Sequence, residues 1–149
     1  MRAPEIKKGS IVADHGWRGT GRFRVARLGA VLLIRFGNVS TKKTRLKADI
    51  GAFFRKEYRA MRPSFGPYRV HIWMEGPNPT RRIDADNIAK ACLDALTGII
   101  WKDDSQVISL AVEKVEAETE AVSLKIEKCT RSAPPDELHH LLAVADGLP

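Results

Sequence analysis

The sequence predicts an α/β (α+β) fold, a two-layer sandwich in which a mixed sheet of about four strands packs against two main helices. Three observations predict it. The chain has 149 residues, near the commonest size of a single domain, and 44% of them are hydrophobic, which is enough for one core. Apolar residues alternate with a period of two in some segments and recur at helical spacing in others. The elements follow the order strand, helix, strand, helix, strand, strand.

The first half of the chain predicts a basic arm, a strand and a helix. Residues 1–28 combine glycines and prolines with many basic side chains, which is typical of an extended arm. Residues 30–36 form a short apolar run that favours a buried strand. From an N-cap at Ser40 or Thr41, apolar residues recur at helical spacing up to Pro63, which predicts one long amphipathic helix.

The second half predicts one more helix and three more strands. Residues 68–75 alternate apolar and polar side chains, as a strand does. Residues 86–97 return to helical spacing, with Gly98 as the stop. Two further strands, joined by an acidic turn, are predicted at residues 107–115 and 121–128.

Charge is distributed unevenly along the chain. Residues 1–62 hold 16 basic and four acidic side chains, whereas the remainder holds nine and 14, so the net charge of +7 hides a strongly basic first half. On charge alone this half suits nucleic acid and an anionic membrane surface equally well. The longest apolar run, at residues 30–34, is too short to span a bilayer, so we expect a soluble cytoplasmic protein with no membrane partner. Cys92 and Cys129 have no metal-site spacing and are expected to be free thiols.

Carboxylates before and after the second helix form the candidate site. In an extended approach to this helix, residues two apart point the same way, so Asp84 and Asp86 can present their oxygens to one point. Lys90 lies one turn beyond Asp86. The segment that follows the helix spans about 23 Å when extended, so Asp104 can return to the same end. Three converging carboxylates require a cation, and oxygen-only ligands favour Mg²⁺.

The same residues also have a purely structural interpretation. Asp84 or Asp86 could be an ordinary N-cap, and Asp94 could pair with Lys90 across one helical turn. Asp104 could belong to simple turn chemistry with its neighbours. Spacing alone leaves both interpretations open.

The segment contains the pattern Asp84-x-Asp86-Asn87-x-x-Lys90-x-x-x-Asp94-Ala95-Leu96-Thr97, followed by Trp101-x-Asp103-Asp104-x-Gln106-Val107. This pattern resembles the signature of the RusA endodeoxyribonucleases, Holliday junction resolvases that prophages often carry. The resemblance implies a homodimeric, Mg²⁺-dependent nuclease, with Mn²⁺ as a substitute, that cuts four-way DNA junctions by paired symmetric nicks in recombination and repair. It implies that the metal-binding acids are Asp84, Asp86 and Asp104 and that the catalytic lysine is Lys90.

The resemblance also divides the chain and suggests where DNA binds. It implies a nuclease domain over residues 29–130, between the basic arm of residues 1–28 and a tail of residues 131–149 in which Asp136 could cap a short helix. DNA phosphates are expected to meet basic side chains beside the acids and on the first helix. These candidate DNA-binding residues are Arg81, Arg82, Lys42, Lys43 and Lys47.

Two other function classes fit the same sequence. The first is a non-catalytic, basic DNA-binding protein of phage origin that retains the RusA-like fold. The second is an interaction protein whose acids hold a stabilising ion and whose basic helix meets a protein partner. Nicks that EDTA suppresses would identify the nuclease, and a steep loss of DNA affinity with added salt would separate the other two.

Overall fold

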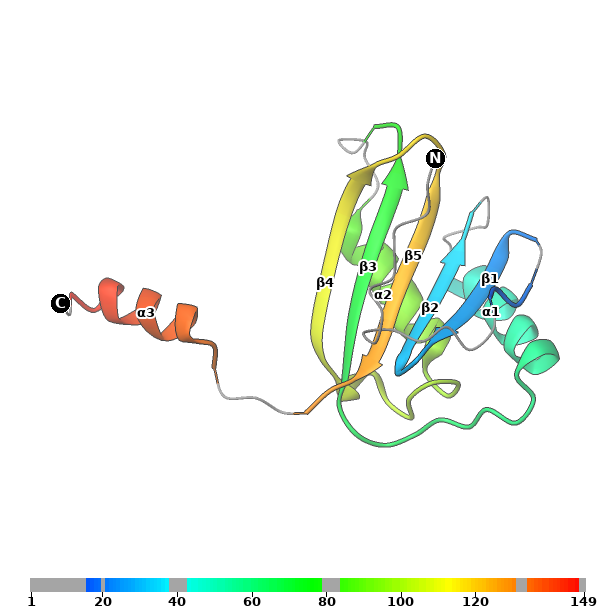
Figure 1. Ribbon diagram of the computed structural model, residues 1–149, viewed down its shortest axis with the longest axis horizontal. Helices are drawn as coiled ribbons and strands as arrows, with labels where there is room; N and C mark the ends of the chain where they lie inside the picture. The colour runs from blue at the N-terminus through cyan, green and yellow to red at the C-terminus, as the bar shows by residue number, and fades with distance from the viewer. Residues whose placement is uncertain (1–15, 20, 38–42, 79–83, 131–133, 148–149) are drawn as a thin grey trace.

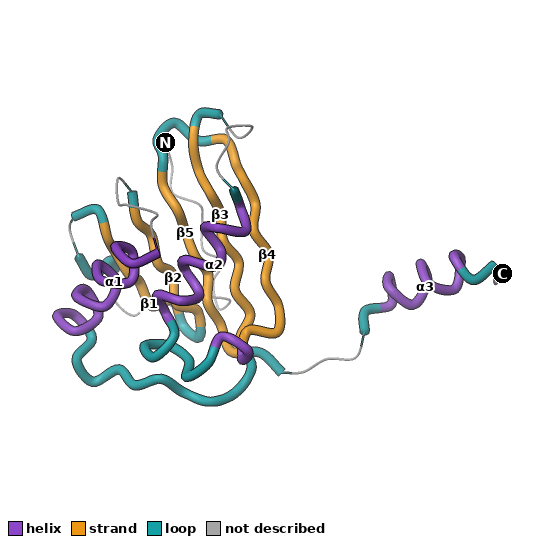
Figure 2. Tube along the Cα trace, turned by 180° about the vertical axis from the view of Figure 1, so that it is seen from behind, coloured by secondary structure: helices purple, strands orange, loops and turns teal. Residues whose placement is uncertain are grey.

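The computed structural model describes residues 16–19, 21–37, 43–78, 84–130 and 134–147. Five strands form one mixed sheet in the order β1-β2-β5-β3-β4. Helices α1 and α2 cover one face of this sheet, and α3 lies clear of it (Figures 1 and 2). The predicted two-layer α+β fold is therefore confirmed. The elements are β1 Phe23–Leu28, β2 Val31–Phe36, α1 Lys43–Glu57, β3 Tyr68–Gly76, α2 Ala85–Leu96, the 3₁₀ turn η1 Asp104–Gln106, β4 Val107–Glu116, β5 Ala121–Lys128 and α3 Asp136–Ala145.

The sheet has one strand more than the sequence predicted. Residues 23–28, assigned to the basic arm, form β1 and pair antiparallel with β2. Leu28 faces Val31 across a two-residue turn in which Gly29 takes a φ of 62°, a left-handed conformation that glycine adopts easily. The boundary expected after residue 28 therefore falls inside a hairpin.

The last two strands are consecutive in the chain but do not pair with each other. β4 runs parallel to β3 at one edge of the sheet, whereas β5 pairs antiparallel with both β2 and β3. The connection after β4 passes β3 to reach β5, as Figure 1 shows at the top of the sheet. β3 is therefore an interior strand and β4 an edge strand.

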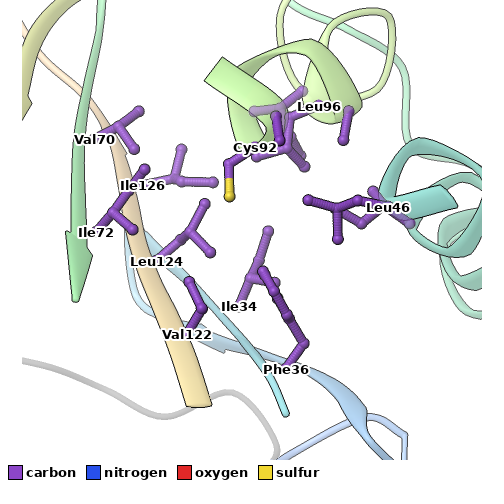
Figure 3. Close-up of a cluster of buried hydrophobic side chains, with 14 of the residues drawn as sticks. Ile34, Phe36, Leu46, Val70, Ile72, Cys92, Leu96, Val122, Leu124 and Ile126 are labelled. Carbon is purple, nitrogen blue, oxygen red and sulfur yellow. The ribbon is translucent and has the colours of Figure 1, made fainter. Parts of the chain in front are cut away.

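The core lies between the sheet and the two helices. Along β3 the buried side chains alternate with half-exposed ones, so Val70, Ile72 and Met74 face the helices. Figure 3 shows Cys92 of α2 directed toward Leu124 and Ile126 of β5. Burial raises the pKa of the Cys92 thiol to about 12, so this side chain stays neutral and packs as a small apolar group.

Two helix boundaries differ from the sequence prediction. α1 ends at Glu57, six residues before Pro63, because the chain leaves the helix through a turn in which the Met61 N–H donates to the Tyr58 carbonyl. The predicted N-cap, at Ser40 or Thr41, lies outside the described residues. In the tail, Pro135 holds the N-cap position and Asp136 is the first residue of α3.

Candidate active site in a groove between α2 and β4

Two aspartates stand at the N-terminus of α2. Asp84 has the extended backbone of an N-cap residue, but its side chain makes no capping bond to the helix backbone. It accepts a hydrogen bond from the side-chain amide of Asn87 at 3.1 Å instead. Asp86 lies in the first turn and accepts from the Asn87 N–H at 3.0 Å. Both carboxylates are exposed at the end of the helix where its dipole stabilises negative charge.

A groove of about 440 Å³ runs between α2 and β4, and Asp86, Lys90 and Asp104 share it. We call it the acidic groove. Its floor is apolar because β4 is an edge strand that α2 covers only in part, so Leu110 remains 45% exposed. Asp84 does not line the groove. The lining residues are Ala85, Asp86, Ala89, Lys90, Leu93, Asp104, Leu110 and Val112.

The short turn that carries Asp104 is held by a network of long-range hydrogen bonds. The Gln106 side-chain oxygen accepts from the backbone N–H groups of Lys102 and Asp103 at 2.9 and 3.0 Å. Its side-chain amide donates to the carbonyls of Ser64 and Gly66, about 40 residues earlier, at 2.8 and 3.0 Å. The turn is thereby tied to the segment that precedes β3.

Asp103 and Asp104 are neighbours with different environments. The Asp103 carboxylate caps η1 by accepting from the Ser105 N–H at 2.9 Å. Hydrogen bonds from Ser105 to the charged form hold the pKa of Asp103 below its ordinary value. Asp104 begins the 3₁₀ turn and lines the acidic groove. The structure thus gives Asp103 a capping role and leaves Asp104 at the groove.

The length of the segment after α2 allows Asp104 to return to the end of the helix that carries Asp84 and Asp86. In the structure Asp104 lies just before β4 and lines one groove with Asp86. It precedes Val107, which pairs with Tyr68 at the start of β3, whereas Asp84 follows the far end of β3 in the chain. The aspartates therefore reach the groove region from opposite ends. Within the described parts of the chain, no three acidic, histidine or cysteine side chains are gathered into a metal-binding cluster.

The physical reason is that the segment after α2 folds instead of extending. Gly98 takes a φ of 89° directly after the helix, and its N–H donates to the Trp101 carbonyl at 2.7 Å. Trp101 is completely buried, and its indole N–H donates to the Thr97 hydroxyl at 3.0 Å. The Ser64 N–H donates to the Ile100 carbonyl. Burying Trp101 therefore keeps this segment at the C-terminus of α2.

The donor set still suits a hard divalent cation. Carboxylate oxygens are the ligands that Mg²⁺ prefers, and Mg²⁺ usually takes one or two of them from a protein. Asp86 and Asp104 share the groove, while Asp84 stands beside it. The chemistry of the residues fits the ion, but a cluster of all three carboxylates is not formed among the residues described.

The other predicted residues are placed as follows. Lys90 is exposed and lines the groove one turn beyond Asp86, whereas Asp94 is half-buried and does not line it. Lys47 is exposed on α1. Lys43 begins α1, but the structure does not describe its side chain. Lys42, Arg81 and Arg82 lie outside the described residues.

Sequence reasoning missed the residues that position the Asp104 turn. Gln106 was noted as part of the motif but was given no role, although its spacing from Asp103 is that of a capping box. Ser64 and Gly66 carry no sequence signal, because they act through backbone carbonyls that only the tertiary structure brings near.

A mixed sheet with two helices on one face and an acidic groove at its edge defines an α+β protein with a candidate site for phosphate chemistry. The chain matches the family Endodeoxyribonuclease RusA over residues 19–127, which is most of its length. It therefore belongs to the RusA endodeoxyribonuclease family, and the resemblance seen in the motif is confirmed. Membership supports a hydrolytic endonuclease, and nucleases of this family generally depend on a divalent metal.

A curated relative gives a shorter match. The "Uncharacterized protein YqaN" of Bacillus subtilis (strain 168) is 44% identical over 50 residues. The match covers 34% of this chain and 35% of the relative, so it spans about a third of each protein. Among the helices in the described ranges, none is both long and apolar enough to cross a membrane.

Proposed function

We propose that this protein is a Mg²⁺-dependent, structure-selective DNA endonuclease that resolves four-way junctions by paired symmetric nicks in recombination and repair. The family match supports the class of reaction. The observation that carries the proposal is that Asp86, Lys90 and Asp104 line one groove within the matched region. A groove lined by two carboxylates and one ammonium group suits a site that handles a phosphodiester.

The metal-binding residues in this proposal are Asp84, Asp86 and Asp104, with Mn²⁺ as a substitute for Mg²⁺. The bound ion would polarise the phosphodiester and lower the pKa of a water molecule. The chain itself contributes the Lys90 ammonium, which lies one helical turn from Asp86 and offsets negative charge in the groove. The bonds of Gln106 hold the turn that carries Asp104.

A homodimer belongs to the same proposal. A four-way junction offers two equivalent strands for cleavage, and a two-fold symmetric dimer offers two equivalent sites. Sedimentation equilibrium of the full chain measures this part separately. A mass of one chain at every concentration, including that of the cleavage assay, would contradict it.

The test is incubation of the full chain with a synthetic four-way DNA junction and Mg²⁺. We expect paired nicks that EDTA suppresses, and a much smaller rate with linear duplex of the same sequence. Metal binding is measured independently by titration calorimetry. Asp104→Asn should lower the cleavage rate more than Asp103→Asn, because asparagine keeps the cap at position 103 but removes a charged groove oxygen at position 104.

A second candidate is a non-catalytic protein that binds branched DNA. It is favoured by the separation of Asp84 from the groove that Asp86 and Asp104 share. This candidate predicts junction binding that weakens steeply with added salt, with intact strands after long incubation in Mg²⁺ or Mn²⁺. Intact strands in both metals would replace the nuclease proposal with this one.

A further inference from the structure

Helix α3 exposes an apolar stripe. Leu138, Leu141, Leu142 and Ala145 recur at positions i, i+3, i+4 and i+7, so they share one side of the helix. The three leucines are 42%, 57% and 55% exposed. Figure 1 shows the helix clear of the sheet, and none of its residues is buried. An isolated helix of ten residues is marginal in water, so this stripe requires a covering surface.

The negative charge of residues 134–147 limits which surface could cover the leucine stripe of α3. Residues 134–147 carry Asp136, Glu137 and Asp146 and no lysine or arginine. The acidic groove has an apolar floor, but Asp86 and Asp104 would repel the segment. Pairing with α3 of a second copy would bring like charges together. The complementary surface is apolar in its floor and basic at its edge.

One groove in the described structure has this composition. It holds about 370 Å³ at the end of β5 and is edged by Arg27, Arg62 and Lys128. Glu127 also lines it, but this carboxylate is within 3.8 Å of Arg69 and 3.6 Å of Lys125, which offset its charge. We call it the basic groove. Its apolar lining includes Val31, Leu32, Met61, Ile100 and Ile126.

The folding of the chain explains why this groove is open. α1 ends at Glu57, and the groove opens where Val31 and Met61 are half-buried beside the buried pair Leu32 and Ile126. The Arg62 guanidinium donates to the carbonyls of Arg59 and Met61 at 2.9 and 3.0 Å, which holds it at the edge. A second hollow shares Arg27, Met61 and Arg62 with the groove and extends the basic surface.

The segment before α3 can bring it to this groove. Lys128 lines the groove and ends β5, and the next N–H, that of Cys129, is fixed to the Pro67 carbonyl at 3.0 Å. Seven residues separate Lys128 from Asp136, and they span up to about 23 Å when extended. We propose that α3 docks its leucine stripe into the basic groove of its own chain, with its acidic side chains toward the arginine and lysine edge.

The main test is hydrogen–deuterium exchange of the full chain, followed by mass spectrometry. We expect the amides of α3 to exchange at least about tenfold more slowly than in the Leu141→Asp variant, since burying leucine side chains stabilises docking. His140→Asp is the matched control, because it adds the same charge on the opposite side of the helix and should keep the protection. Exchange of α3 at the variant's rate in the unmodified chain would overturn the proposal.

The groove is tested by a matched charge reversal. Arg27→Glu should reduce the protection of α3 severalfold, whereas Arg45→Glu, an equal change at an exposed position of α1, should leave it intact. Oxidation of Met61 by peroxide should accelerate severalfold when residues 134–149 are deleted, with buried Met74 as the internal reference. An unchanged Met61 rate with protected α3 would mean that another surface covers the helix.

Varying the protein concentration tests whether α3 docks on its own chain or on a second copy. Docking within one chain predicts α3 protection that is the same at low and high protein concentration. Protection that grows with concentration would assign the groove to a second copy, and protection that appears only with an added protein would assign the stripe to a different partner. Either result would overturn the proposal, and neither depends on whether the protein cuts DNA.

Discussion

The two ends of the acidic groove are built in different ways. At the Asp86 end, the described hydrogen bonds of Asp84 and Asp86 go to Asn87, their neighbour in the chain. At the Asp104 end, Gln106 bonds to carbonyls about 40 residues away, and a completely buried tryptophan fixes the loop. The Asp86 end is therefore exposed and held by contacts between near neighbours in the chain, whereas the Asp104 end is held by contacts with distant segments.

This difference predicts which mutations separate chemistry from stability. Removing a carboxylate at the Asp86 end should change function and leave the fold intact. Disturbing the network at the Asp104 end should change both properties together. Four predictions test this, and they begin with the largest effect.

Asp86→Asn should reduce junction cleavage by about 100-fold or more, since it removes a charged ligand from the proposed site. Binding of the junction should be retained or tightened, because a negative charge near phosphate is lost. The midpoint of urea unfolding should stay the same. Single-turnover cleavage of a labelled junction measures the rate, and Glu118→Gln, an exposed acid in the turn before β5, is the control. Cleavage by Asp86→Asn at the original rate would refute the assignment.

Trp101→Ala should lower the free energy of unfolding by about 3–5 kcal/mol, because it empties a completely buried site. Trp73, half-buried on the sheet face opposite the helices, supplies the matched change, and Trp73→Ala should cost much less. Urea unfolding followed by circular dichroism measures both variants. Equal costs for the two would show that the loop after α2 is not anchored by Trp101.

Gln106→Ala should lower the free energy of unfolding by about 1–2 kcal/mol, because it removes bonds to four backbone groups. It should also slow cleavage with little change in junction affinity, since Gln106 positions Asp104 without contacting DNA in our proposal. Gln106→Glu separates the contributions of the acceptor and the donor. It keeps an acceptor for the Lys102 and Asp103 N–H groups and loses the donor to the Ser64 and Gly66 carbonyls. A variant as stable and active as the unmodified chain would contradict this role.

The smallest effect concerns pH. The pKa of Asp103 lies below its ordinary value in the folded protein, so its carboxylate contributes stability that is fully present above about pH 4 and is lost as the pH falls through the lowered pKa. The Tm difference between the unmodified chain and Asp103→Ala should therefore shrink on acidification. Thermal unfolding at neutral and acidic pH measures it. A difference that grows toward low pH would have the wrong sign.

The sequence was most informative where contacts are local. Strict alternation defined β3 and β5, and helical spacing with Gly98 as a stop defined α2 almost to the residue, because side-chain periodicity reports directly which face is buried. β1 was assigned to the arm, because Arg24 and Arg27 follow a glycine-rich basic segment and the pairing with β2 is visible only in the tertiary structure. The extended length of the segment after α2 limits how far Asp104 can lie from the helix, but length alone does not predict where Asp104 comes to lie.

By itself, the sequence determined the residue types at the site: aspartates two apart at the start of a helix, a lysine one turn further along it, and an aspartate pair after a tryptophan. These follow from the chain's own spacing. Only the tertiary structure decided that Asp86, Lys90 and Asp104 share a groove while Asp84 stands beside it, and that Asp103 caps a turn. The physical reason is that these outcomes depend on burying Trp101 and on backbone carbonyls brought from a distant segment, whose positions no local pattern contains.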